Sequence, residues 1–144
     1  MDTVSDILAI KGPVVHGVRR TATVYEAIES MTRYNVGALL VTDEDQLCGI
    51  ITERDYLRRV ALQGRTSKTT LVDEVMSTKL VCVSPSTSLE RCMQLMTERR
   101  IRHLPVLNGD RLAGIVSIGD IVKNLIQEQA THIQHLTDYI QGRA

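Results

Sequence analysis

Two pairs of polar residues in this sequence have the types and the spacing of a small binding site. Thr52 and Asp55 lie three residues apart in GIITERD, and Ser117 and Asp120 have the same spacing in GIVSIGD. A hydroxyl followed three positions later by a carboxylate is the signature of a capping box, which opens a helix. The start of a helix also attracts phosphate, because its N–H groups are unpaired and its dipole is positive there. Each pair can therefore cap a helix, bind an anion, or do both.

The two pairs belong to a longer internal repeat. Residues 23–60 align with residues 88–125 at a constant offset of 65, without a gap and with nine identities in 38 positions. The identical pairs are Met31/Met96, Thr32/Thr97, Leu39/Leu104, Val41/Val106, Asp45/Asp110, Leu47/Leu112, Gly49/Gly114, Ile50/Ile115 and Asp55/Asp120. One structural unit therefore occurs twice. A capping box also works with Glu or Gln, so the Asp in both copies favours a ligand role over capping alone.

The composition restricts the class of protein. The chain has 144 residues, of which 43% are hydrophobic, and each unit of about 60 residues would be marginal alone, so we expect a core shared by both units. Seventeen basic and 17 acidic residues give no overall field for nucleic acid. No apolar run reaches the roughly 20 residues that span a membrane, and the N-terminus lacks the pattern of a secretory signal. A cytoplasmic location is the expectation.

The sequence lacks the signatures of catalysis and of metal binding. It contains no Walker lysine loop, no H-E-x-x-H pair and no nucleophile motif. Cys48, Cys82 and Cys92 follow no C-x-x-C spacing, and we expect them to be buried small hydrophobic side chains in a reducing compartment. His132 and His135 have a spacing that suits a metal, but no third ligand lies nearby in the sequence, so we interpret them as exposed. We expect a binding module and not an enzyme.

Both units have the same predicted order of elements. In the first unit we expect a strand at 12–18, a helix from Thr23, a hairpin at 36–42 and 46–52, and a second helix from Thr52. In the second unit we expect a strand at 79–85, a helix from Ser88, a hairpin at 101–107 and 111–117, and a second helix from Ser117. The predicted fold class is therefore α/β, as a tandem pair of β-α-β-β-α motifs.

A polar segment and an apolar stripe mark the rest of the chain. Residues 63–70 (QGRTSKTT) contain no apolar side chain and predict a linker between a first motif at 1–62 and a second at 71–126. A helical extension is expected at 127–144, with its end near Gly142. An apolar stripe runs along this helix at intervals of four and three residues, with one polar member. Its residues are Val122, Ile126, Gln129, Ile133, Leu136 and Ile140. This stripe can pack on its own chain or on a second copy.

The duplicated G-h-h-[ST]-x-x-D pattern, with a matching helix and hairpin before each copy, resembles the cystathionine beta-synthase (CBS) domain family. The resemblance covers Val4 to about Ile126, and the stretches IRHLPV and GALLV are typical of the second strand in that family. Its members occur as tandem pairs called Bateman modules. The resemblance implies a free-standing pair with pseudo-twofold symmetry, which binds adenosine-containing ligands such as AMP, NAD or ATP in two clefts. It also implies a homodimer formed through helices.

The resemblance assigns the ligand's sugar and base to particular residues. Asp55 and Asp120 match the ribose-binding aspartates, and an ionised Asp can accept hydrogen bonds from both ribose hydroxyls. The hydroxyls of Thr52 and Ser117 are expected to donate to the phosphate. The wall of the adenine slot is expected to come from Val36, Gly37, Ala38, Leu39, Ile101 and Leu104. The alternative for the aliphatic members of this set is ordinary core.

Basic residues near the same strands are the phosphate candidates. Arg102 and His103 fall in the strand that lines the cleft in the family, and Arg54 lies inside the first motif. Lys11 is a weaker candidate, just before the predicted opening strand. The alternative for the run from Arg99 to His103 is a solvated helix end.

The two clefts are not expected to be equivalent. Gly37 and Ala38 stand where the second copy has Arg102 and His103. The sequence therefore predicts small walls for the Asp55 cleft and a fixed cation for the Asp120 cleft. Two alternatives remain: Arg54 can supply a phosphate contact to the Asp55 cleft, and residues of one cleft can reach across the central groove to the other.

The function that these observations favour is a sensor of adenosyl nucleotides. AMP or NAD is the favoured ligand, ATP is possible, and no metal is expected. Such a module would regulate a partner protein that the sequence does not identify. The alternative is a structural dimerisation adaptor with vestigial clefts.

Overall fold

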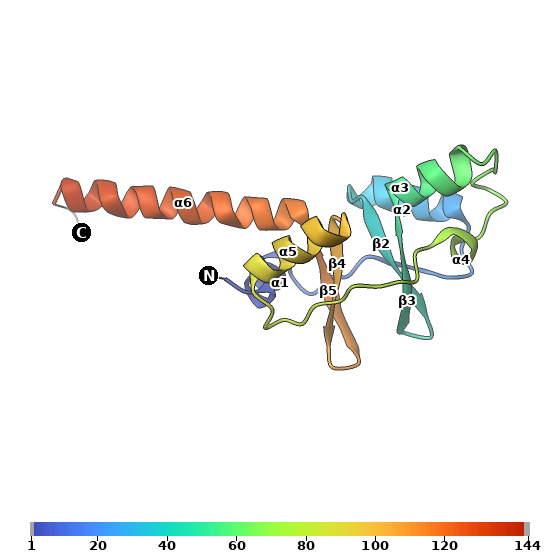
Figure 1. Cartoon of the computed structure of the whole chain (residues 1–144), viewed down its shortest axis with the longest axis horizontal. Helices are drawn as coiled ribbons and strands as arrows, with labels where there is room; N and C mark the ends of the chain where they lie inside the picture. Colours follow the sequence, from blue (N-terminus) through green and yellow to red (C-terminus); the bar gives the residue numbers. More distant parts are fainter. Residues whose placement is uncertain (1, 143–144) are drawn as a thin grey trace.

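The computed structural model describes residues 2–142 as two similar α/β units followed by a long helix (Figure 1). The first part of the chain contains α1 (Val4–Lys11), β1 (Gly17–Arg19), α2 (Val24–Tyr34), β2 (Ala38–Asp43), β3 (Gln46–Thr52), α3 (Glu53–Tyr56) and the π-helix η1 (Leu57–Ala61). The second part contains α4 (Val72–Val75), α5 (Leu89–Arg99), β4 (His103–Asn108), β5 (Arg111–Ser117) and α6 (Ile118–Ile140). The predicted α/β pair with a long C-terminal helix is confirmed.

The two hairpins have the same register and bring the start of one strand beside the start of the next helix. Ala38 of β2 pairs with Thr52, and His103 of β4 pairs with Ser117. In the first turn Glu44 and Asp45 both have positive φ, 49° and 65°, as a tight two-residue hairpin turn requires. Each hairpin therefore places its hydroxyl-carboxylate pair next to the residues that precede β2 or β4.

The opening strands differ from the prediction. In the first unit the strand occupies only Gly17–Arg19 of the expected region and pairs in parallel with β2. In the second unit the expected strand at 79–85 is reduced to a single bridge, Val83 to Val106. Pro105 of β4 is equivalent to Leu40 of β2. Neither Pro105 nor Pro85 has a backbone N–H, so the ladder of hydrogen bonds cannot extend on either side of that bridge. The second sheet therefore has two strands and the first has three.

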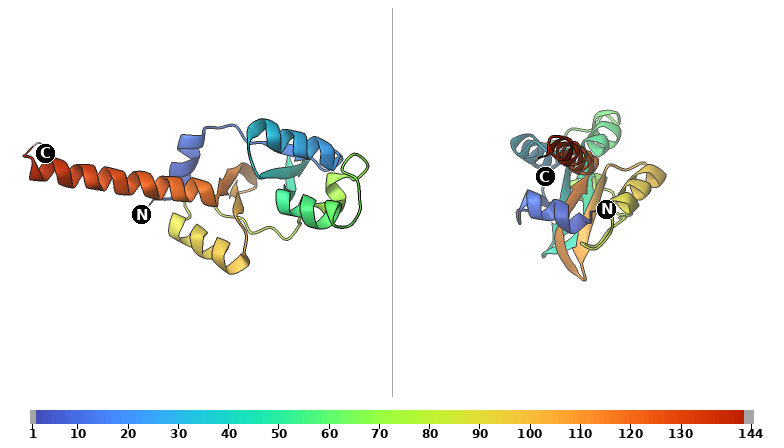
Figure 2. Two further views of the ribbon diagram at one scale, coloured as in Figure 1. Left: turned by 90° about the horizontal axis from the view of Figure 1, so that it is seen from above. Right: turned by 90° about the vertical axis from the view of Figure 1, so that its left-hand side faces the viewer.

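Helices α1 and α4 cross between the units. Val4 and Ile7 of α1 are buried in the core of the second unit, while Val72 and Val75 of α4 are buried in the core of the first. Matching backbone bridges hold the starts of these helices, Thr3 to Ser88 before α1 and Leu71 to Thr23 before α4. Figure 2 shows α1, in blue, beside the base of α6 and away from the rest of the first unit. Each unit is therefore completed by a helix that precedes the other unit's hairpin.

The two sheets pack against each other through a third apolar cluster. Its buried members Ala38, Leu40 and Ile50 come from the first hairpin, and Leu112 and Ile115 of β5 pack against them. The expected core shared by the two units is confirmed. Of the three cysteines expected to be buried, only Cys92 is fully buried; Cys48 is half-buried and Cys82 is exposed.

The predicted helix starts at Thr23 and Ser88 are confirmed. The Thr23 hydroxyl accepts from the N–H of Glu26, and the Ser88 hydroxyl accepts from the N–H of Arg91. Both helices end at a residue in the left-handed conformation, Asn35 in α2 and Arg100 in α5. This C-terminal turn directs the chain after Arg100 back toward β4.

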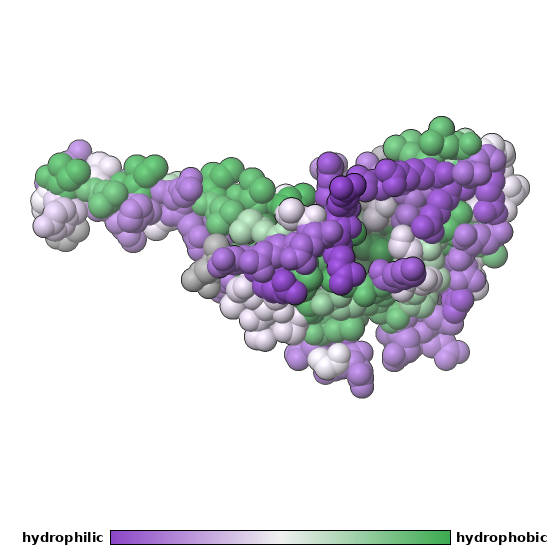
Figure 3. Space-filling view, viewed as in Figure 1, coloured by the Kyte–Doolittle hydropathy of each residue, from purple (hydrophilic) through white to green (hydrophobic). Residues whose placement is uncertain are grey.

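Helix α6 leaves the body of the molecule after its first turns. Ile121 is fully buried and Leu125 packs on the core of the second unit, but Ile133 and Ile140 of the stripe are 63% and 82% exposed. Figure 3 shows hydrophobic atoms, in green, along this projecting helix. Packing on its own chain therefore accounts for only the base of α6. Within residues 2–142, no helix has the length and apolar character needed to span a membrane.

Glycines in β3 and β5 allow the crossing helices to approach the sheets. A Cβ added at Gly49 would lie 2.6 Å from Met76 Sδ and 3.0 Å from the Ser77 carbonyl oxygen. A Cβ at the equivalent Gly114 would lie 2.8 Å from Leu8 Cδ2, the movable end of a side chain. The contact at Gly49 therefore has less freedom to relax, because part of it is backbone.

We expect Gly49→Ala to lower the free energy of unfolding by about 1–3 kcal/mol, the range for overpacked cores. Gly114→Ala should cost less, since Leu8 can change rotamer. Gly119→Ala is the matched control, because its added Cβ would meet only the Ser117 hydroxyl at an ordinary 3.6 Å. Urea unfolding of the three variants measures the order, and equal losses at Gly49 and Gly114 would contradict it.

Candidate functional site

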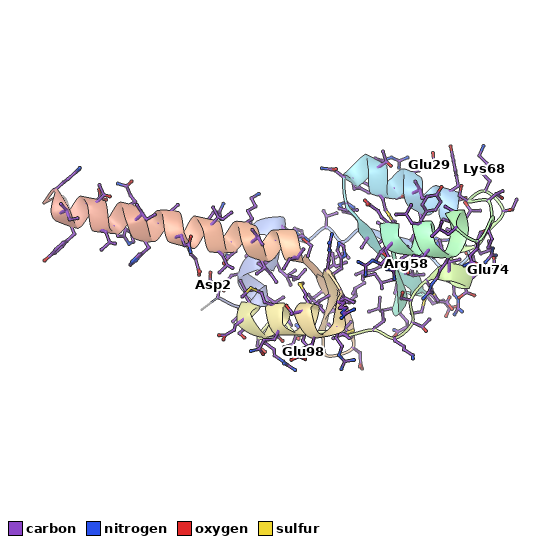
Figure 4. The ribbon with its side chains drawn as sticks, turned by 45° about the horizontal axis from the view of Figure 1, so that its top comes forward. Asp2, Glu29, Arg58, Lys68, Glu74 and Glu98 are labelled. Atoms are coloured by element: carbon purple, nitrogen blue, oxygen red, sulfur yellow. The ribbon has the colours of Figure 1, made fainter. Side chains whose placement is uncertain are left out.

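A cavity of about 770 Å³ lies between the two units and contains the first hydroxyl-carboxylate pair. One side is formed by Gly37, Ile50 and the start of α3, and the other by the residues from Arg100 to His103. The segment from Met76 to Val81, which joins α4 to the second unit, completes the wall. Side chains of both units project into the space between them in Figure 4. A cavity of this volume can hold a small-molecule ligand.

Asp55 is the buried carboxylate of this cavity. It is 8% exposed, and its Oδ2 accepts from the Thr52 backbone N–H at 2.9 Å and the Thr52 hydroxyl at 3.1 Å. Its Oδ1 accepts from the Ser77 hydroxyl at 3.2 Å. The predicted capping box is therefore formed. A carboxylate has about four acceptor positions, so capping does not by itself exclude a ligand.

Cations outnumber carboxylates around the cavity. Its lining contains Arg54, Arg59, Lys79, Arg100 and Arg102, against Glu53 and Asp55. In a protein whose formal net charge is zero, this local excess favours an anionic ligand.

Arg59 is fixed by the backbone of the crossing segment. Its Nη1 donates to the carbonyl oxygens of Val75 at 3.0 Å and Met76 at 3.2 Å, while its Nε lies 4.0 Å from Asp55 Oδ1. Arg59 lies in the π-helix η1, which follows α3 directly. The side chain therefore links α4, Asp55 and the cavity.

The second pair lies at the start of α6 and has a different partner. Asp120 Oδ2 accepts from the Ser117 backbone N–H at 2.9 Å and from Lys11 Nζ at 2.9 Å. Lys11 Nζ also donates to the Ile115 carbonyl oxygen at 2.8 Å. Burial opposes ionisation of Asp120, but the hydrogen bonds from Lys11 and Ser117 outweigh it and hold the pKa of this carboxyl below its usual value.

His103 lies between the two pairs. It lines the Asp55 cavity, and its Cε1 would lie 3.8 Å from a Cβ added at Gly37. Burial lowers the pKa of His103 more than the Asp120 and Glu53 carboxylates raise it. The imidazole is therefore neutral at neutral pH and offers a ligand hydrogen bonds without adding charge.

The predicted cation of the Asp120 cleft lies on the Asp55 side, which is the case of residues reaching across the central groove. Arg102 and His103 line the cavity that contains Asp55, because the starts of β2 and β4 face each other across the space between the units. The cation beside Asp120 is Lys11. Arg54 does line the Asp55 cavity, as the position of its motif suggests.

The predicted aliphatic wall is divided between the cavity and the core. Ile101 and Gly37 line the cavity. Val36 instead borders a smaller neighbouring cavity of about 490 Å³. Three other candidates, Leu39, Leu104 and Ala38, are buried in the apolar clusters, so the alternative of ordinary core holds for them.

Several lining residues were missed by the sequence reasoning. Ser77, Lys79 and Arg59 all lie outside the two hydroxyl-carboxylate pairs and the hairpins. A second offset would have identified one of them: residues 4–11 align with 72–79 at an offset of 68, which pairs Lys11 with Lys79. Within residues 2–142, no group of three or more His, Cys, Asp or Glu side chains is arranged to hold a metal ion. His132 and His135 are exposed on α6.

Comparison with known proteins identifies the repeat. The family model described as the CBS domain matches residues 4–62 and 72–127. A CBS domain-containing mitochondrial protein of Arabidopsis thaliana, CBSX3, is 46% identical over 97% of this chain and 72% of its own length. The CBS domain-containing protein YhcV of Bacillus subtilis is 38% identical over 94% of this chain and 97% of its own length.

A solved structure supports the same assignment. A protein with CBS domains from Burkholderia ambifaria is 50% identical and superposes with a TM-score of 0.85, over 88% of this chain and 96% of that one. Both the sequence relatives and the structural relative therefore span the two units together.

The Lys11–Asp120 pair predicts a pH dependence of stability. Because the folded-state pKa of Asp120 lies below its ordinary value of 3.8, the stabilisation is present above that value and is lost as pH falls through the folded-state pKa. We expect wild type to lose more stability than Asp120→Asn between about pH 5 and about pH 3, as measured by urea unfolding. Lys11→Met should reduce the dependence in the same direction. Identical pH profiles for wild type and Asp120→Asn would contradict the prediction.

Proposed function

This chain belongs to the CBS-domain family, and we propose that it is a sensor module that binds an adenosyl nucleotide in the Asp55 cavity and modulates a partner protein. The observation that carries the proposal is the cavity itself. It combines a buried carboxylate, an excess of cations and apolar wall residues in a volume of about 770 Å³. These are the groups that a ribose, a phosphate and a purine base require.

Asp55 supports the ribose part of the proposal. Its carboxylate already accepts from Thr52 and from Ser77, so two ribose hydroxyls would take the remaining acceptor position and replace the Ser77 hydroxyl. Ser77 is a neutral donor, which a ligand can displace with little loss. Its hydroxyl would then be free to turn toward the ligand.

The apolar lining of the cavity supports the base. Ile50, Leu80, Val81, Ile101 and Pro105 supply apolar surface in the same cavity. Backbone groups of this wall remain at its edge because the strand expected at 79–85 forms only one bridge to β4. A flat base inserted here would bury its faces and could bond to these backbone groups at its edge.

Arg102 and Arg54 support the phosphate. Both are exposed and line the cavity, one from each unit. A guanidinium binds phosphate through two parallel hydrogen bonds, which a neutral ligand cannot exploit. AMP and NAD remain the favoured ligands, because one phosphate or a pyrophosphate suffices for these two guanidinium groups; ATP remains possible.

The apolar stripe on α6 supports a homodimer as part of the proposal. Its intervals alternate between four and three residues, as in the heptad repeat of a coiled-coil seam, and Gln129 is its one polar member. A seam of this kind pairs with another helix of the same kind, and residues 2–142 contain no second helix of comparable length. The same stripe favours the second candidate function, a dimerisation adaptor whose cavity is not used.

Calorimetric titration separates the two candidates and tests the phosphate contact. We expect Arg102→Ala to weaken AMP by about 10- to 100-fold, the scale of hydrogen bonds between charged groups, and to change the affinity for adenosine much less. Arg99→Ala is the matched control, because Arg99 is exposed at the end of α5 and is not a cavity residue. Failure of wild type to bind AMP, NAD or ATP would leave the adaptor function.

Truncation tests the dimer. Ending the chain after Gln127 removes Ile133, Leu136 and Ile140, and we expect the shortened protein to be monomeric, or concentration-dependent in mass, by light scattering. Leu136→Glu in the full chain should act in the same direction, whereas His135→Glu should not, since His135 lies outside the stripe. A stable dimer after truncation would place the subunit contact elsewhere.

A further inference from the structure

The two motif aspartates are balanced by different groups. Asp55 is accompanied by the Ser77 hydroxyl and by Arg59, neither of which closes the cavity. Asp120 is accompanied by Lys11, whose ammonium makes an ion pair with it at 2.9 Å. The ammonium uses a second hydrogen bond, to the Ile115 carbonyl oxygen, to stay at this position. The Lys11 ammonium therefore contacts Asp120, the carboxylate that corresponds to Asp55.

Comparison of the two repeat units explains why Lys11 pairs with Asp120. The position equivalent to Ser77 is Ala9, at an offset of 68, and the position equivalent to Arg59 is Asn124, at an offset of 65. Ala9 has no hydroxyl. Asn124 is 8% exposed and its buried Oδ1 has no hydrogen-bond partner, so it does not replace the guanidinium. A partly buried carboxylate without these groups needs another cation, and Lys11 supplies it.

The first unit shows the opposite arrangement at the equivalent lysine. Lys79 corresponds to Lys11, but it is exposed and lines the cavity instead of pairing with Asp55. Ser77 and Arg59 already satisfy Asp55, so Lys79 is not required there. The same lysine position therefore closes one half-site and borders the other.

We propose that Lys11 is an internal occupant of the Asp120 half-site, which limits each chain to one nucleotide, bound in the Asp55 cavity. The inference rests on the proposed function for the identity of the ligand. Two ribose hydroxyls would have to displace a charged ammonium, and a charge-assisted hydrogen bond is roughly twice as strong as a neutral one. Displacing Lys11 opens a second site on Asp120, at the N-terminus of α6.

The test is the number of AMP molecules bound per chain, measured by calorimetry on the full chain. Wild type should bind one. Lys11→Met, which keeps the length of the side chain and removes its charge, should bind two, with affinity for the second AMP raised at least about tenfold. Lys68→Met is the control, because Lys68 is exposed in the linker and does not line the cavity, and it should leave the number at one. Lys11→Gln should act as Lys11→Met does, and thermal unfolding of each variant shows that the chain remains folded.

Two further variants assign the sites. Asp120→Asn placed in the Lys11→Met chain should remove the second site, and Asp55→Asn in the same chain should remove the first. Two AMP molecules bound by wild type, or no gain in Lys11→Met and Lys11→Gln, would overturn the inference. Absence of binding to wild type with one Asp120-dependent site in Lys11→Met would instead sink the proposed use of the Asp55 cavity and support the role of Lys11.

Discussion

The packing of α1 on the second unit and of α4 on the first is the contact on which the rest of the structure depends. Val4 and Ile7 fill the core beneath β5, and Val72 and Val75 fill the core beneath β3. Because the two helices cross, the segment that follows α4 runs into the space between the units and forms part of the wall of the cavity. Fold completion and site formation are therefore achieved by the same exchange of helices.

The exchange also explains how two units with the same hairpin register produce two unequal half-sites. The hairpins and helix starts of the two units have one register, so Asp55 and Asp120 have the same backbone surroundings. Their side-chain partners come from the crossing segments and from the helices after the motifs, where the sequences differ. Ala9 and Asn124 differ from the equivalent Ser77 and Arg59, and the cation that balances the carboxylate differs with them.

Local patterns predicted the parts of this fold that local forces determine. The hydroxyls of Thr23 and Ser88 begin their helices as expected, because a cap is made within three residues. The strand at 79–85 could be judged only in part from its own residues, since Pro85 removes one N–H but the other missing N–H belongs to Pro105 in a different strand. Likewise, the Lys11–Asp120 pair joins residues 109 positions apart, and Arg102 reaches the Asp55 side only because the two units face each other. Contacts of this kind depend on how the two units pack against each other, which a local sequence motif does not indicate.

The crossing of the helices has a consequence for the order of folding. The first unit lacks only α4, so its core can close once α4 has been synthesised. The second unit needs α1, which is synthesised before the rest of both units but cannot complete its packing until β5 and the start of α6 are made. Val4 and Ile7 therefore remain exposed to solvent until β5 and the start of α6 are made. Their docking then closes a loop of more than 100 residues. Such distant contacts form late, which slows folding.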